Sequence, residues 1–206
     1  MVLVGSRYES GAAERSPSTT SSFVTDIVCA FNASNLSAPF VTYMSPEEAK
    51  VHGMTVAHCG PCADCSNMED IKTLVTTRHT ITKAAKTCGR TAVLGSTDEL
   101  DECLEDRIGF TDKCRTCWVE NMECDVESCL FTCMKTLFTG MLRSNNVVGI
   151  KGSLNHCLQC DEQRCGTPFI TCSGASRRRL GIHSDIERNP NEVCRQTIDW
   201  LSYPFD

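Results

Sequence analysis

The sequence has few aromatic residues and no long apolar run. Only 6% of its 206 residues are Phe, Tyr or Trp, so large rings cannot supply most of a core. No run of about 18 apolar residues occurs, and the sequence therefore predicts no membrane-spanning helix. The net charge of −6 argues against nucleic acid as a partner.

Cysteine is the residue that the chain has in excess, with sixteen copies. Hydrophobic residues make up 41% of the chain, but without cysteine that share falls to about one third, below the usual value. An even number of cysteines permits eight disulfides, and this density is typical of an oxidising compartment: an organelle lumen or the cell exterior. A reduced protein that holds metal is the competing interpretation. We expect disulfides among Cys29, Cys59, Cys62, Cys65, Cys88, Cys103, Cys114, Cys117, Cys124, Cys129, Cys133, Cys157, Cys160, Cys165, Cys172 and Cys194.

Several short patterns predict where helices begin. Ser45 is followed by Pro46 and two acids, which is the order of a cap, a first helical residue and a dipole-favoured first turn. The capping-box pattern pairs a hydroxyl residue with Glu three positions later. It occurs at Ser66 with Glu69, at Ser96 with Glu99 and at Ser184 with Glu187.

Apolar residues and cysteines recur at helical spacing over most of the chain from residue 45 onward. The spacing predicts one helix over 67–88, and Asn189-Pro190 predicts a last helix that ends near Trp200. The most regular pattern predicts a core-facing stripe. Its members are Val126, Cys129, Leu130, Cys133, Met134, Leu137 and Met141.

The patterns together predict an all-α fold. We expect a small helical domain over 45–200 that is stapled by disulfides, because no strand-like alternation of useful length occurs there. Residues 1–44 are expected to form a flexible or extended arm, and residues 201–206 a C-terminal tail. Two sequons, at Asn32 and Asn35, are chance matches unless the chain enters the secretory route.

Three cysteine pairs lie three or four residues apart on predicted helices: Cys114/Cys117, Cys129/Cys133 and Cys157/Cys160. Within a helix, such Cβ atoms are about 5–6 Å apart, further than a disulfide prefers. Each pair is therefore expected to bridge to a neighbouring helix, and two helices joined twice would form a rigid hairpin. The connectivity itself stays open.

The motif Cys59-Gly60-Pro61-Cys62 has the four residues of a thioredoxin-like redox site. In that interpretation Cys59 is the nucleophile, Cys62 the resolving thiol and His58 a modulator of the thiolate. Cys65 adds a third sulfur, which favours structural disulfides instead. The fourth ligand of an iron–sulfur run is missing, and the CxxC pairs are spaced too widely for a zinc ribbon. We therefore predict no metal and no cofactor, and no other catalytic motif is recognised.

Two features could contact a partner protein. Arg177, Arg178 and Arg179 form the one basic cluster of the chain, suited to carboxylates or anionic headgroups. Trp200, Tyr203 and Phe205 concentrate aromatic rings in the tail, where they could anchor a partner. The alternatives are that the arginines pair with acids such as Asp185 or Glu187, and that the tail covers the core of its own domain.

Four segments carry a resemblance to a known family: CGPCADCSNMEDI, GFTDKCRTCW, CLQCDEQRCGTPF and CSGASRRRLGIHSDI. Over about 59–194 the chain resembles a cysteine-rich family of unicellular algae and related protists that has no assigned activity. The resemblance implies, by context, an extrinsic subunit that links light-harvesting antennae to photosystem I in the thylakoid lumen.

The function expected from the sequence is that of a non-enzymatic assembly subunit. It would dock on protein subunits of a larger, membrane-bound complex. A thiol–disulfide oxidoreductase using the CGPC motif and a secreted cysteine-rich binding protein are the alternatives.

Overall fold

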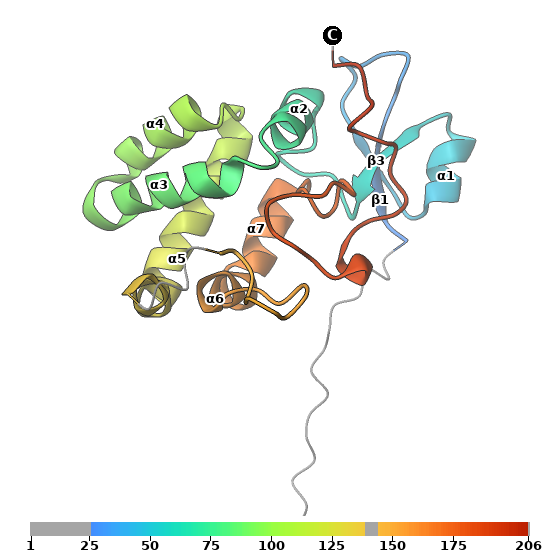
Figure 1. The fold of residues 1–206 in the computed structure, drawn as a ribbon. Helices are drawn as coiled ribbons and strands as arrows, with labels where there is room; N and C mark the ends of the chain where they lie inside the picture. Colours follow the sequence, from blue (N-terminus) through green and yellow to red (C-terminus); the bar gives the residue numbers. More distant parts are fainter. Residues whose placement is uncertain (1–25, 139–143, 206) are drawn as a thin grey trace, which may run out of the picture.

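The computed structural model of the chain describes residues 26–138 and 144–205 (Figure 1). Its three strands and seven α-helices follow one another in the order β1 Val28–Phe31, β2 Val41–Tyr43, α1 Pro46–Val51, β3 Thr55–Cys59, α2 Met68–Thr76, α3 Ile81–Leu94, α4 Thr97–Arg107, α5 Asp112–Phe138, α6 His156–Arg164 and α7 Gly166–Ser173. A 3₁₀ helix, Pro190–Glu192, follows. No helix in these two ranges is both long enough and apolar enough to cross a membrane.

A small antiparallel sheet with strand order β2-β1-β3 stands at one end of the molecule, beside α1 (Figure 1). All four residues of β1 are buried. The all-α prediction is therefore incomplete: the chain is mostly helical with a three-stranded sheet. The strand β3 is only five residues long, too short for its alternation to stand out from a helical background.

The arm predicted over residues 1–44 belongs in part to the folded domain. Residues 1–25 lie outside the described residues. From Val28 onward the chain supplies the central strand of the sheet, and the ring of Phe31 is 1% exposed in the main core. The boundary at residue 44 is therefore wrong for β1 and β2.

Helices α3 to α7 form the other end of the molecule (Figure 1). The 27-residue helix α5 packs against α4, α6 and α7, while α3 packs against α4. The single helix predicted over 67–88 is wrong, because a turn at 77–80 separates α2 from α3. Threonines at both ends of that turn donate their hydroxyls to backbone carbonyls, a local bond that competes with helical pairing.

The predicted helix starts have mixed outcomes. Ser45 caps α1 by accepting a hydrogen bond from the backbone N–H of Glu48, and Ser96 with Glu99 forms a reciprocal capping box. The helix start predicted at Ser66 is wrong, because Asn67 caps α2. Ser184 starts no helix and instead accepts from the N–H of Ile186.

The last helix predicted from Asn189 to Trp200 is also wrong. Only the 3₁₀ turn forms, and the segment after it runs alongside the sheet toward the C-terminus (Figure 1). The predicted stripe on 126–141 lies on α5 but is only partly covered: Cys129 is buried and Met134 is 42% exposed. The side chain of Leu137 and all of Met141 lie outside the described residues.

All sixteen cysteines are in disulfides, which confirms the prediction of a stapled domain. The bonds join Cys29–Cys62, Cys59–Cys194, Cys65–Cys114, Cys88–Cys103, Cys117–Cys172, Cys124–Cys165, Cys129–Cys160 and Cys133–Cys157.

The last four of these bonds connect α5 to the α6–α7 pair and are called the disulfide ladder below. From Cys117 to Cys133 along α5, the partner cysteines follow in reverse sequence order, from Cys172 to Cys157. The expected hairpin of two doubly joined helices is confirmed for α5 and α6. The ladder fixes the register of the helical end without a large aromatic core.

Candidate functional site

The CGPC motif begins at Cys59, the last residue of β3, and continues into the loop that follows. Its two cysteines do not bond to each other: Cys59 pairs with Cys194 and Cys62 with Cys29. Gly60 has φ +83°, and a Cβ there would lie 2.7 Å from the guanidinium carbon of Arg179. The glycine is thus required by backbone conformation and by the close approach of an arginine. This arrangement is structural and lacks the dithiol pair of a redox site.

Next to this loop, His58 and Ser66 form a buried pair that sequence reasoning did not find. The Nδ1 atom of His58 lies 3.0 Å from the carbonyl oxygen of Cys59, and Nε2 lies 2.8 Å from Ser66 Oγ. A carbonyl can only accept, so Nδ1 carries the proton and the Ser66 hydroxyl donates to Nε2. Ser66 Oγ also accepts from the N–H of Ala63 at 2.9 Å. The pairing explains why Ser66 does not cap α2.

The His58–Ser66 pair has the connectivity of a base and a nucleophile but not their chemistry. Ser66 lies at the edge of a cavity of about 360 Å³ that is lined also by Leu36, Phe40 and Met68. Burial lowers the pKa of His58 to about 4, well below the range near 7 that suits a general base. Ser66 is only 8% exposed, and its hydroxyl already forms hydrogen bonds with two partners. We therefore infer that the His58–Ser66 pair stabilises the loop and has no catalytic role.

The three consecutive arginines point to different parts of the fold. Arg177 Nη1 lies 2.7 Å from Asp185 Oδ1, and Arg178 Nη1 lies 3.0 Å from Glu162 Oε2. Arg179 Nη1 donates to the carbonyl oxygen of Gly174 at 2.9 Å. The interpretation as one exposed docking cluster is thus contradicted, and internal pairing, including the predicted acid Asp185, describes their positions.

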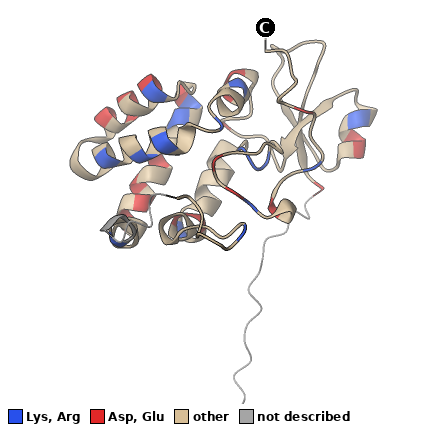
Figure 2. Ribbon diagram, in the orientation of Figure 1, with Lys and Arg blue, Asp and Glu red and all other residues tan. Residues whose placement is uncertain are grey.

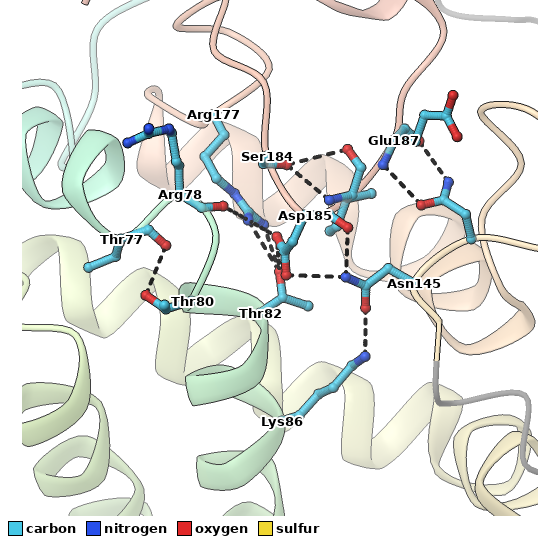
Figure 3. Close-up of polar contacts among 12 residues, drawn as sticks. Thr77, Arg78, Thr80, Thr82, Lys86, Asn145, Arg177, Ser184, Asp185 and Glu187 are labelled. Atoms are coloured by element: carbon cyan, nitrogen blue, oxygen red, sulfur yellow. Dashed lines mark hydrogen bonds and ion pairs between the residues drawn. The ribbon is translucent and has the colours of Figure 1, made fainter. Parts of the chain in front are cut away.

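Arg177 is the centre of a polar network that joins α3 to the segment after α7 (Figure 3). Thr82 donates its hydroxyl to Asp185 at 2.9 Å, and Arg177 Nη1 donates to the carbonyl oxygen of Arg78 at 3.1 Å. Asn145 donates to both the backbone and the carboxylate of Asp185. Burial lowers the pKa of Arg177, but the adjacent carboxylate opposes that effect. The network thus holds the segment after α7 against α3, which no disulfide joins to it.

The aromatic tail folds back on the core. Trp200 is 1% exposed, and its ring centroid lies 5.7 Å from that of Phe31 and 5.8 Å from that of Phe205. The ring of Tyr203 packs against Phe31 and Trp200 as well. Of the two interpretations of the tail, coverage of its own domain describes these positions, and a buried Trp200 cannot anchor a partner.

Within the disulfide ladder, Asp161 lies near enough to Asp125 to act on its charge. Burial and the neighbouring Asp161 raise the pKa of Asp125 to about 7. Burial and the nearby Glu162 raise the pKa of Asp161 to about 6, although a hydrogen bond from Asn121 opposes the shift. Asp125 Oδ1 is buried and has no hydrogen-bond partner. No local sequence signal predicts this pair, since it depends on the register that the ladder sets.

In the part of the chain that the structure describes, two groupings of cysteine and carboxylate have the proximity of metal ligands. Asp64 lies near Cys117 and Cys172, and Asp125 near Cys129 and Cys165. All four sulfurs are in disulfides, so none can supply the thiolate that binds zinc or iron. Neither grouping is therefore a candidate metal centre.

Acidic residues are concentrated on α4 and α5, whereas the charged residues of α3 are basic (Figure 2). The segment 97–138, which holds α4 and α5, carries eleven acidic and four basic residues, a net charge of −7. Helix α3 has three basic residues and no acid. The predictions made from the sequence did not use this contrast between acidic and basic helices, although the order of charged residues along the chain indicates it.

One part of the chain is similar to a protein family. A model of a family of unknown function (DUF8771) matches residues 97–196, just under half of the chain. The matched segment runs from α4 past α7 and includes every bond of the disulfide ladder. No curated protein and no solved structure matches the chain. The helical end is thus similar to a family without an assigned function.

Proposed function

We propose that the chain is a non-enzymatic assembly subunit that docks, as a rigid body, on a larger membrane-bound protein complex. The observation that carries this proposal is the use of all sixteen cysteines in disulfides, including both cysteines of the CGPC motif. A body cross-linked in this way loses little conformational entropy on binding, which favours a role as a spacer or linker.

Eight disulfides are consistent with an oxidising or extracellular environment. We place the protein, more specifically, in an organelle lumen such as that of the thylakoid, where it would link antenna proteins to photosystem I. That specific placement rests on the resemblance of the cysteine-rich segments alone.

Two alternatives make different predictions. An oxidoreductase would need Cys59 and Cys62 to form a reversible disulfide with each other, whereas each has a distant partner. An insulin-reduction assay should therefore give the same background rate for the wild-type chain and for Cys59→Ser. A secreted binding protein would keep the disulfides but leave the cell.

Gradient sedimentation of gently solubilised membranes tests the proposal. We expect the native protein in fractions far heavier than its 22.7 kDa chain, and cross-linking mass spectrometry should join it to other subunits. Migration solely as a 22.7 kDa species, without cross-links to another protein, would contradict docking.

A further inference from the structure

Helices α3 and α5 present matching stripes of opposite charge. On α3, the basic stripe consists of Lys83, Lys86, Arg90 and Leu94. On α5, the acidic stripe consists of Glu120, Glu123, Glu127 and Phe131. All eight residues are exposed.

The two stripes have the same spacing. Both run through steps of three, four and four residues, so each member of the acidic stripe lies 37 positions after its counterpart. At 100° per residue, each set falls within an arc of about 80° on its helix. Each stripe therefore forms one continuous face with charges first and an apolar residue last.

Within residues 26–138 and 144–205, no member of either stripe forms a salt bridge, although Asp185 lies near enough to Lys86 to interact with its charge. Among the described residues, no carboxylate lies within ion-pairing distance of Lys83 or Arg90, and no cation pairs with Glu120 or Glu127. Lys86 donates to Asn145 Oδ1, and Glu123 accepts from the hydroxyl of Thr97. Most of the charge on both faces is thus available to another molecule.

The apolar ends set the direction of pairing. Leu94 is 88% exposed and Phe131 is 87% exposed, with Val93 and Met134 beside them at 43% and 42%. A parallel alignment brings Leu94 to Phe131 and each cation to a carboxylate. The reverse alignment would place Leu94 against Glu120. Parallel pairing therefore satisfies both the charges and the apolar residues.

We propose that the basic stripe of α3 binds the acidic stripe of α5 on a second copy of this chain. The two stripes differ, so the contact is heterologous and each bound copy still offers one stripe to the next. This inference goes beyond docking on other proteins and holds for the purified chain alone.

The expected association is weak and sensitive to salt. A 14-residue helix is about 21 Å long, and one such pair buries less than the roughly 1,200–2,000 Å² of a stable interface. Exposed ion pairs are screened over about 10 Å at 0.1 M salt. Association should therefore grow with protein concentration and fall when salt is raised.

Sedimentation velocity of the purified, fully oxidised chain tests the proposal. Arg90→Glu and Glu127→Arg should each lower the association constant by about tenfold or more, because each places like charges opposite one another. The double variant R90E/E127R should recover the wild-type constant. Leu94→Ser and Phe131→Ser should weaken association without abolishing its dependence on salt.

Matched controls use α1, which lies at the other end of the molecule (Figure 2). Lys50→Glu has the same net charge as Arg90→Glu, and Glu47→Arg the same as Glu127→Arg; both positions are exposed. These controls should associate like the wild type. A monomer at every concentration, equal loss in the controls, or a double variant that fails to recover would each overturn the proposal.

Discussion

The indole N–H of Trp200 donates a hydrogen bond to the carbonyl oxygen of Ala57 over 2.8 Å, across 143 positions of sequence. Ala57 lies in the edge strand β3, so this bond attaches the last segment of the chain to the sheet. Three other rings pack around the indole. Burial of a large ring with its polar atom satisfied is a strong stabilising contribution in a chain with few aromatic residues.

Replacing Trp200 should show both contributions. Trp200→Ala should lower the free energy of unfolding by about 3–5 kcal/mol, because it leaves a large cavity. Trp200→Phe keeps a ring but leaves the carbonyl of Ala57 unpaired, and should cost about 1–3 kcal/mol. Denaturant unfolding measures both, with Leu201→Ala, at an exposed neighbour, as the control. Equal stability of all three variants would contradict the packing of the tail.

Loss of a ladder bond should destabilise more than loss of a short-range bond. The Cys124–Cys165 bond closes a separation of 41 residues, and Cys88–Cys103 closes only 15. Loop-closure entropy predicts costs of about 4 and about 3 kcal/mol when each pair is replaced by serine. Thermal and denaturant unfolding of the two double variants give the comparison. A larger loss for Cys88→Ser/Cys103→Ser would argue against an entropic role for the ladder.

The carboxylate pair should make stability fall as pH rises. The pKa values of Asp125 and Asp161 are raised from 3.8 to about 7 and about 6, so the folded chain keeps protons that the unfolded chain loses near pH 4. This contribution is complete below pH 4 and is lost as pH rises through 6 to 7.

Asp125→Asn should therefore raise stability at pH 8 by roughly 1–3 kcal/mol and leave it nearly unchanged at pH 4. Glu120→Gln, on the exposed side of the same helix, is the control and should show no such dependence. Unfolding at several pH values measures the effect. A variant whose stability follows the wild-type curve would show that the two carboxylates do not share a buried site.

Breaking the ion pair in the Arg177 network should be costly. Asp185→Ala removes the acceptor for Arg177 and for the hydroxyl of Thr82, leaving a buried guanidinium without its charge partner. Loss of one member of a buried pair typically costs about 3–5 kcal/mol. Glu187→Ala, at an exposed position two residues later, should change stability by less than about 0.5 kcal/mol. Similar values for the two variants would contradict a structural role for the network.

The helical spacing of cysteines was enough to predict that two neighbouring helices would be joined twice, but not that these would be α5 and α6. It could not predict that Cys114 reaches Cys65 in a loop while its neighbour Cys117 reaches α7, because those partners depend on how distant segments pack. Ser66 shows the same limit. Its sequence pattern favours a capping box, but His58 takes the hydroxyl, and only the tertiary fold brings the two together.

The arginine triplet shows why a charged cluster in sequence need not form a surface patch. Arg177, Arg178 and Arg179 lie in an irregular segment where successive side chains point in different directions, so each reaches a different partner. The stripes on α3 and α5 lie on regular helices, where spacing does determine a common face. Their charge pattern was therefore visible in the sequence, whereas their exposure required the fold.

Disulfide mapping of the native chain tests the central claim, that the CGPC cysteines are structural. Trypsin cleaves after Lys50 and Lys72, so one peptide, 51–72, holds Cys59, Cys62 and Cys65. The fold predicts that mass spectrometry without reduction finds this peptide joined to three others, those with Cys29, Cys114 and Cys194. A peptide joined only to the one that holds Cys114, with an internal bond between Cys59 and Cys62, would contradict the claim and restore the redox interpretation.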